Sequence, residues 1–540
     1  MSHLKMKTQS ALLRMLPVVV AAVTLLLATA AHAAVPGISG PSFNLTAGAT
    51  SISQPDGEMI YSWGYGCNGA AKFVPFSGNC PSVQIPGPTL IVNEGDIVTV
   101  VLTNNLPASV GNTSIVFPGF QVCAGTLANG VCTPNGGVPG LLAQEAAHGG
   151  TVTYMFDTAK KAGTHSYYSG TQSDLQIEMG MYGALVVLPA TAQSACTPVG
   201  NIGGSTDDYR LASSAYDNSS TCYDREYLFQ WAELDSRIHR RAEEQVQAAG
   251  TCAPSATVSC LSIPTEPYHP NYFLINGRSM PDDMDANYAP NYPNQPYNGN
   301  PHMHPGELVL LRVIGQGRWQ HPFHEHSNHV RILGRDGNLI LSQTDPTKLG
   351  GRLEFTTDTT PGQAFDGIFY YTGRGLNWDV YGHTPSNAQN PACFPDANGY
   401  YTTNSNPAAV HPSYDAGGNM ISGAANYYEW CADHNHPMET NPTGQVGHGG
   451  MVTPPDPNIL ANGLWYNGSP YLSPDAVARS MGPTPLPPSG TVVNAPNEAG
   501  IAFMWHSHNE REITTNDVFP GGMMMMMLVD PWTWYIDETK

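Results

Sequence analysis

Residues 83–104 read VQIPGPTLIVNEGDIVTVVLTN, which consists of two runs rich in β-branched and apolar residues. Between the runs stands Asn93-Glu94-Gly95-Asp96, a series of residue types that favours a turn. Short runs of this composition, bounded by turn residues, are typical of β-strands. The stretch therefore predicts two strands joined by a tight turn, and it points to an all-β fold.

A second pair of segments shows that the chain uses one β unit twice. The first copy reads AGTHSYYSGTQSDLQ at 162–176 and continues as GMYGALVVLP at 180–189. The second copy reads AGIAFMWHSHNERE at 499–512 and continues as GGMMMMMLVDP at 521–531. Repetition at so long a spacing indicates duplicated domains rather than a solenoid of short repeats.

The composition is that of a turn-rich extracellular β protein. Only 12% of the 540 residues are charged, while 56 are Gly and 46 are Pro. The formal net charge of -21 argues against nucleic acid and anionic membranes as partners. Helical periodicity is scarce, and the best candidate for a helix is 235–249, with a face rich in Arg and Glu.

The N-terminus has the order of a secretory signal. Lys5, Lys7 and Arg14 precede an apolar stretch at 16–27, and Ala31-His32-Ala33 offers a small-x-small cleavage site. No other stretch is long and apolar enough to span a membrane. We therefore expect the mature chain to be soluble and periplasmic or extracellular.

The ten cysteines fall into successive close pairs, as expected for a disulfide framework in an exported protein. Connectivity does not follow from sequence alone, and sequential pairing is the hypothesis adopted here. It joins Cys67 with Cys80, Cys123 with Cys132, Cys196 with Cys222, Cys252 with Cys260, and Cys393 with Cys431.

Two histidine clusters lie far apart in the chain. One reads HPFHEHSNH at 321–329, and the other reads WHSH at 505–508. Residues two apart on a strand share one face of the sheet, so each His-x-His step would present two imidazoles together. If the two strands are neighbours, four rings converge on a metal site, and imidazole suits copper, zinc, iron and nickel.

At this point the chain resembles the multicopper oxidases, which are built from cupredoxin domains, that is, Greek-key β-sandwiches. The resemblance covers most of 80–190, 270–371 and 491–531. Its specific pieces are IPGPTLIVNEGD, GMYGALVV, HPGELVLLRVI, HPFHEH, PGQAFD and WHSH followed by Pro-Gly-Gly-Met. The expected fold is therefore all-β, with two cupredoxin-like Greek-key β-sandwich domains and a long irregular insertion in the second.

The resemblance also implies a domain organisation. It comprises a signal peptide at 1–33, a first domain without metal ligands at 34–190, a linker at 191–224, a second domain with the metal site at 225–376 and 491–540, and an insertion at 377–490.

Carried over residue by residue, the family's copper ligands fall on five histidines of this chain. His321 would bind type 1 copper, and the ligands of the oxygen-reducing cluster would be His324, His326, His506 and His508. The strong type 1 ligand, a cysteine, is replaced by Ser507, and the next type 1 histidine falls on Glu512. Only the axial methionine has a candidate, Met523.

The first domain departs further from the family pattern. Its two His-x-His pairs correspond to Val116 with Pro118 and to Tyr168 with Gly170. Half of the copper cluster is thus missing, and these residues do not support an ordinary laccase cycle. The four remaining imidazoles would hold one copper, or two with carboxylate or water completing the coordination. Glu512 is the candidate catalytic residue, as an acceptor that orients a ligating ring or as a ligand itself.

We therefore expect a copper-dependent oxidoreductase acting on a metal ion or small molecule at a His-rich site without type 1 copper. The main alternative is a non-catalytic copper-binding or surface-assembly protein derived from a multicopper oxidase. A nitrite-reductase-like trimer is a third reading, which depends on Cys431 of the motif Cys-x2-His-x3-Met as a blue-copper thiolate. A homo-oligomer or an extracellular electron-transfer partner stays open.

Overall fold

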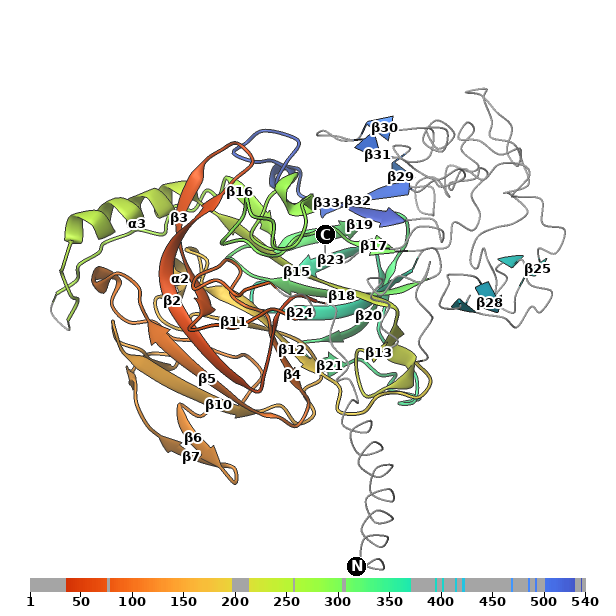
Figure 1. The fold of residues 1–540 in the computed structure, drawn as a ribbon, viewed down its shortest axis with the longest axis horizontal. Coiled ribbons are helices and arrows are strands. Elements are labelled where there is room, and N and C mark those ends of the chain that lie inside the picture. The colour runs from red at the N-terminus through yellow and green to blue at the C-terminus, as the bar shows by residue number, and fades with distance from the viewer. Residues whose placement is uncertain are drawn as a thin grey trace, which may run out of the picture. The chain divides into compact units, whose positions relative to one another are not determined.

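The computed structural model describes residues 35–74, 78–196, 213–255, 258–303, 307–370 and 501–529, with Ile536 and a few short strands between 394 and 492. The predicted signal peptide, most of the predicted insertion, Cys393 and Cys431 lie outside these residues. Strands dominate the described part, and its longest helix is α3 (Ser236–Ala249) (Figure 1). The predicted all-β fold is confirmed.

The first sandwich is made of two four-stranded sheets packed face to face. One sheet has the order β1 (Ile38–Ser39), β4 (Leu90–Asn93), β12 (Tyr182–Leu188) and β11 (Gly163–Tyr168). The other has the order β10 (Thr151–Asp157), β5 (Ile97–Asn104), β2 (Ser42–Ser53) and β3 (Met59–Cys67). Leu185 of the former and Val100 and Tyr154 of the latter belong to one buried apolar cluster.

The opening stretch of the sequence forms the crossing between these two sheets. β4 ends at Asn93 and β5 begins at Ile97, and the strands belong to different sheets. Gly95 has a φ of +89°, which a glycine adopts without steric cost, and the Asp96 carboxylate accepts the Asn93 N–H at 2.8 Å. The predicted turn is therefore confirmed, and it carries the chain from one layer to the other.

The second sandwich repeats this arrangement with larger sheets. Its first sheet has the order β16 (Tyr272–Ile275), β15 (Arg225–Leu234), β18 (Leu308–Gly315), β24 (Ala364–Tyr370), β20 (Val330–Arg335) and β21 (Asn338–Leu339), and β22 (Leu353–Glu354) pairs with β20. Its second sheet has the order β17 (His302–Met303), β33 (Met524–Val529), β32 (Ile501–Ser507), β19 (His321–Glu325) and β23 (Thr356–Thr359), and β29 (Gly468–Ser469) pairs with β32.

The core of the second sandwich explains the five-methionine run. Met523, Met525 and Met527 are fully buried and pack in one cluster with Trp505 and Phe323. The flexible methionine side chain fills irregular space between the sheets. Met523 is thus part of an apolar core.

Smaller elements complete the described part. The hairpins are β6 (Gly125–Ala128) with β7 (Val131–Pro134), β8 (Val138–Pro139) with β9 (Gln144–Glu145), and β13 (Ser213–Ser214) with β14 (Cys222–Tyr223). The short helices are η1 (Ala108–Val110), α2 (Ser173–Gln176), η3 (Ser219–Thr221), η4 (Asp282–Met284) and η5 (Glu510–Ile513). The remaining strands are β25 (Phe394–Pro395), β26 (Tyr401–Thr402), β27 (Ser413–Tyr414), β28 (Met420–Ser422), β30 (Thr484–Pro485) and β31 (Thr491–Val492).

The helix predicted at 235–249 is present as α3. The Asp235 carboxylate caps its first turn by accepting the Arg237 N–H at 3.1 Å. On its buried face, Ile238 and Ala242 join the core of the first sandwich, beside β3. Among the described residues, no helix combines the length and the apolar character that crossing a membrane requires.

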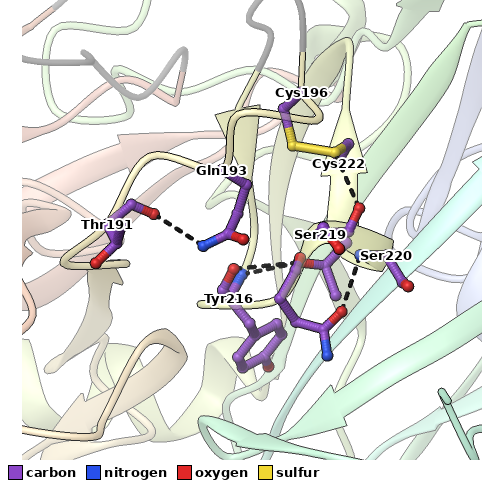
Figure 2. The surroundings of a disulfide bond; sticks show 9 residues. Thr191, Gln193, Cys196, Tyr216, Ser219, Ser220 and Cys222 are labelled. Atoms are coloured by element: carbon purple, nitrogen blue, oxygen red, sulfur yellow. Dashed lines mark hydrogen bonds between the residues drawn. A yellow bond between two sulfur atoms is a disulfide. The ribbon is translucent and has the colours of Figure 1, made fainter. Parts of the chain in front are cut away.

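Four of the five predicted disulfides are present, with the predicted sequential pairing. The fifth, between Cys393 and Cys431, lies outside the described residues. The Cys196–Cys222 bond ties the segment after β12 to β14, at the entry to the second sandwich (Figure 2). Two strand sets thus follow each other along the chain, although the exact limits predicted for the domains stay predictions.

Candidate metal centre

The two histidine clusters lie on neighbouring strands. β19 and β32 pair antiparallel, with His324 opposite His506 and Phe323 opposite Ser507. Because side chains alternate along a strand, His324 and His326 share one face of this sheet with His506. The condition set by the sequence, that the two strands be neighbours, is met.

Four imidazoles come together on this face. The Nε2 atoms of His326 and His506 are 3.1 Å apart, and one ligand atom each of His324, His326 and His506 lies within 4.8 Å of the others. The ring of His508 has its centroid 4.8 Å from that of His324 and 5.5 Å from that of His506. His508 is exposed, whereas the other three are buried, so the group opens toward solvent on its side.

Hydrogen bonds on the far side of two rings fix their orientation. Nδ1 of His324 is 2.6 Å from Oγ1 of Thr356, its cross-strand partner on β23. Nδ1 of His506 donates to the carbonyl oxygen of Ser507 at 2.6 Å. A metal-binding imidazole commonly uses one nitrogen for the metal and donates the other N–H to such an acceptor. In this arrangement Nε2 of both rings is the nitrogen on the side of the other imidazoles.

The electrostatics of the group favour neutral imidazoles. Burial, followed by the neighbouring imidazoles, lowers the pKa of His324 to about 4 and that of His326 to about 3. Burial also lowers the pKa of His506. Since a metal binds the neutral ring, these side chains are in the ligating state at pH 7.

His321 lies on the opposite face of β19. His321 is three residues before His324, and an odd spacing places two side chains of one strand on opposite faces. The His321 side chain therefore points toward the core of the second sandwich. It is fully buried, with Nδ1 at 2.9 Å from Glu512 Oε2 and Nε2 at 2.9 Å from Glu233 Oε2. His321 was expected to bind type 1 copper, and in this placement both of its ring nitrogens are instead hydrogen-bonded to carboxylates.

Glu512 also lies on the core side of β32. Its carboxylate accepts hydrogen bonds from Ser507 Oγ at 2.5 Å and from Asn509 Nδ2 at 2.8 Å, besides its contact with His321. Its hydrogen bonds among the described residues thus go to His321, Ser507 and Asn509 and not to the rings of the other four histidines, and its role as the candidate catalytic residue stays a prediction. Glu512 is fully engaged beneath the strand that carries His506 and His508.

The residues at the type 1 copper position do not fit that metal. A blue-copper site needs a thiolate and imidazole donors, but here Ser507 supplies a hydroxyl group that is hydrogen-bonded to Glu512. Both ring nitrogens of His321 face carboxylates. The proposed substitute thiolate, Cys431, lies outside the described residues.

The corresponding face of the first sandwich carries other side chains. Val116 and Tyr168, at two of the positions where the family has histidine, pair through their backbones, with the Val116 N–H donating to Tyr168 O at 2.8 Å. Nearby, Ser114, Thr171 and Glu145 form a chain of hydrogen bonds of 2.8–2.9 Å. A network of hydroxyl and carboxylate groups thus stands in the region of the missing half-cluster.

Two partners of the histidines could not be assigned from the sequence. Glu233 is on β15, in the other sheet of the sandwich, and Thr356 is on β23. The one available signal was an acidic residue within the otherwise apolar run FQWAEL at 229–234. A buried strand that contains a carboxylate calls for a buried donor, but the alternation of the strand does not say which one.

Comparisons with known proteins support the resemblance. A family model described as multicopper oxidase matches residues 82–192. Multicopper oxidase MCE of Talaromyces pinophilus is 35% identical over 136 residues, which are 25% of this chain and 20% of that protein. Iron transport multicopper oxidase FET3 of Saccharomyces cerevisiae is 38% identical over 105 residues, which are 19% of this chain and 15% of that protein.

The match thus spans a fifth or less of the length of these relatives. Among solved structures, the blue copper oxidase of Nitrosomonas europaea aligns over 90% of this chain and 85% of its own, with a TM-score of 0.43 and 16% identity. Residues 82–192 of the chain are thus similar to the multicopper oxidase family, both in the family model and in these relatives.

Proposed function

We propose that the protein is a copper-dependent oxidoreductase whose metal is held by His324, His326, His506 and His508. The observation that carries the proposal is the 3.1 Å separation of the His326 and His506 Nε2 atoms on two paired strands. Nitrogen ligands of one metal ion, each about 2.0 Å from it, lie about this far apart. The close separation favours one copper shared by the rings over two coppers further apart.

The similarity to multicopper oxidases points to copper as the cofactor, and the donor set fits it. Imidazole is a suitable ligand for copper, and at least three of the four rings are held neutral by their surroundings. When bound, copper would supply a centre that accepts and donates single electrons. The protein residues would fix the rings through Thr356 and the Ser507 carbonyl, and would leave the His508 side open for a small substrate.

The proposed substrates are metal ions and small molecules that reach the centre directly. Electron transfer through a separate type 1 copper is not supported, because the residues at that position do not fit the metal. The yeast relative is named an iron transport multicopper oxidase, which makes ferrous ion a suitable first substrate to test. We also propose that the chain is exported, since four disulfides suit an oxidising compartment.

A non-catalytic copper-binding protein is the second candidate. Two observations favour it, namely the absence of histidine at Val116, Pro118, Tyr168 and Gly170 of the first sandwich and the hydroxyl of Ser507 in place of a thiolate. In this case the protein would bind copper at the same four histidines without turning over a substrate.

Copper loading of the purified protein tests both candidates. We expect about one copper per chain, an electron paramagnetic resonance (EPR) spectrum of Cu(II) in a nitrogen environment without a blue thiolate band, and oxygen consumption with ferrous ion. The double variant His506→Ala/His508→Ala should lose the metal and the activity. His269→Ala is the matched control, because the exposed His269 enters the hydrogen bonding only through its backbone N–H.

Copper binding without oxygen consumption would favour the second candidate. If the wild-type protein retains no copper, or if the double variant consumes oxygen as well as the wild type does, the proposed function is wrong.

A further inference from the structure

A buried imidazole with two carboxylate partners occupies the position of the family's type 1 copper. His321, Glu233 and Glu512 are each no more than 2% exposed. The two ring nitrogens of His321 point to different carboxylates, each at 2.9 Å. The three residues come from β19, β15 and η5, so the group joins both sheets of the second sandwich to the segment that follows β32.

The hydrogen bonds around the carboxylates define where the protons are. Glu233 Oε1 accepts the backbone N–H groups of Arg318 and Trp319 at 2.8 and 2.9 Å, and Glu512 accepts the donors of Ser507 and Asn509. Carboxylates that receive several donors are stabilised in the ionised form, which has no proton to donate. Both nitrogens of His321 must then donate, which makes the ring a cation.

The electrostatic balance agrees with this geometry. Burial by itself lowers the pKa of His321, but the hydrogen bonds to Glu233 and Glu512 outweigh burial and raise the pKa to about 9. An unpaired charge in such a place would cost several kcal/mol, whereas a fully hydrogen-bonded pair offsets its own desolvation. The group is thus one positive charge between two negative ones.

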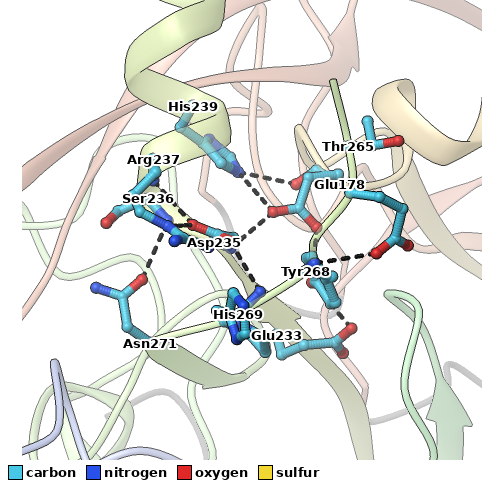
Figure 3. A network of polar contacts seen from close by, with 12 residues as sticks. Glu178, Glu233, Asp235, Ser236, Arg237, His239, Thr265, Tyr268, His269 and Asn271 are labelled. Carbon is cyan, nitrogen blue, oxygen red and sulfur yellow. Dashed lines mark hydrogen bonds and ion pairs between the residues drawn. The ribbon is translucent and has the colours of Figure 1, made fainter. Parts of the chain in front are cut away.

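Further polar groups continue the network behind Glu233 (Figure 3). The Tyr268 hydroxyl lies 3.0 Å from Glu233 Oε1 and 2.7 Å from Glu178 Oε2. The Tyr268 hydroxyl has one proton and can donate it to only one of these two carboxyl groups. Burial raises the pKa of Glu178 to about 8, so Glu178 is mostly protonated at pH 7 and can donate to Tyr268 while Tyr268 donates to Glu233. The Arg318 guanidinium stacks on the Tyr268 ring and pairs with Glu266. The Tyr182 hydroxyl also lies close enough to Glu233 and Glu178 to interact with both electrostatically.

The group is connected to the metal ligands through the backbone of β32. The Ser507 hydroxyl donates to Glu512, while the Ser507 carbonyl on the same residue accepts the N–H of the His506 ring. One residue further, the His508 N–H donates to Pro322 O at 2.8 Å, next to His321. His321 and Glu512 therefore help to fix β19 and β32, the two strands that carry the candidate metal ligands and are called the ligand strands below.

We propose that the His321 imidazolium, held between Glu233 and Glu512, is a positioning cation that replaces type 1 copper and holds the two ligand strands in place. The multicopper oxidases hold type 1 copper at this position, whereas this chain has a protonated imidazole there. The inference deepens the proposed function, because the strands that it positions carry His324, His326, His506 and His508.

The first test uses the metal-free protein, so that it does not depend on copper. In a histidine NMR titration of the full chain, one ring should stay protonated up to about pH 9, and its signal should be missing in His321→Gln. In Glu512→Gln, which keeps an acceptor for Ser507, the pKa of this ring should fall by at least one unit. His269→Gln, the matched control, should leave the signal unchanged.

The second test measures positioning. Hydrogen exchange of the Ser507 and His508 amides should be at least tenfold faster in Glu512→Gln and in Ser507→Ala than in the wild type. Copper affinity should fall by a similar factor in both variants, with changed EPR parameters, and should be unchanged in His269→Gln.

The inference is overturned if no histidine stays protonated above pH 8, or if the variants exchange these amides at the wild-type rate. A wild-type protein that binds no copper would contradict the proposed function, while the measurements on the metal-free protein would still decide the role of His321.

Discussion

At the scale of single residues, the lowered pKa values of the candidate ligands predict how copper binding depends on pH. Protons compete with a metal for the same ring nitrogens, and the competition begins only near the pKa of the ring. With pKa values of about 4 for His324 and 3 for His326, we expect copper affinity to change little between pH 7 and 5 and to drop steeply below about pH 4. Equilibrium titrations with Cu(II), with the fold followed by circular dichroism, would check this.

Affinity that declines tenfold per pH unit from pH 6.5 downward, while the circular dichroism stays constant, would show that the rings have ordinary pKa values. That result would contradict the compact, buried group described above.

Glu325, between two of these histidines, leads to a prediction about stability. Its side chain is buried on the core side of β19, and its carboxyl oxygens have no hydrogen-bond partner among the described residues. Burial raises its pKa well above 4.5, so above that pH the folded chain binds this proton more strongly than the unfolded chain does. Glu325 therefore lowers the free energy of unfolding, and it does so more strongly as the pH rises above about 4.5.

Glu325→Leu should accordingly raise the free energy of unfolding by about 1–3 kcal/mol near pH 8, and by less near pH 5. Thermal unfolding of the metal-free wild type and variant at both pH values gives the two differences. A variant that is less stable than the wild type at pH 8 would mean that the carboxyl group has a favourable partner.

At the scale of elements, strand alternation and the repeat were enough to predict the main elements and the convergence of four histidines. The period of two places His324, His326, His506 and His508 on one face as soon as their strands pair. The same period also places His321 on the other face, in agreement with the carry-over from the family, which assigned it to a separate type 1 copper. Its partner Glu233 could not be predicted, because contacts between sheets depend on how the two layers pack.

The cap of α3 gives a prediction at this scale. The Asp235 carboxylate accepts the Arg237 N–H at the start of the helix and the His269 N–H at 2.9 Å from the neighbouring loop. Burial acts against the ionised form, but the hydrogen bonds with Arg237 and His269 outweigh it and lower the pKa of Asp235. The stabilisation by the Asp235 carboxylate is therefore fully present above its pKa in the unfolded chain, about 4. It is lost as the pH falls through the lower pKa that Asp235 has in the folded chain.

We expect Asp235→Ala to lower the free energy of unfolding by about 1–2 kcal/mol at pH 7. Denaturant unfolding measures the change, and Arg240→Ala, on the exposed side of the same helix, is the control. Equal losses in the two variants would show that the cap has no special role.

At the scale of the whole molecule, one buried carboxylate joins the two sandwiches. Asp366 on β24 accepts the Thr164 N–H and hydroxyl group at 3.1 and 2.6 Å, and the Tyr216 hydroxyl at 2.7 Å. Arg312 lies 3.5 Å from the same carboxylate and 2.7 Å from Glu226. All of these side chains are buried, so the polar groups depend on one another for hydrogen bonds and for balancing charge.

Removing Asp366 leaves the donors of Thr164 and Tyr216 without their acceptor in a place that water does not reach. We expect Asp366→Ala to lower the free energy of unfolding by about 3–5 kcal/mol, the usual cost of breaking a buried ion pair on one side. Because this carboxylate links β11 of the first sandwich to β24 of the second, the single cooperative transition should split into two. Thr164→Val removes the hydroxyl group's hydrogen bonds with Asp366 and Arg312 and keeps the charges, so it should cost about 1–2 kcal/mol and keep a single transition. One transition in both variants would show that the other contacts between the sandwiches, such as those of Gln316 with Ser166 and Gly183, are enough to couple them.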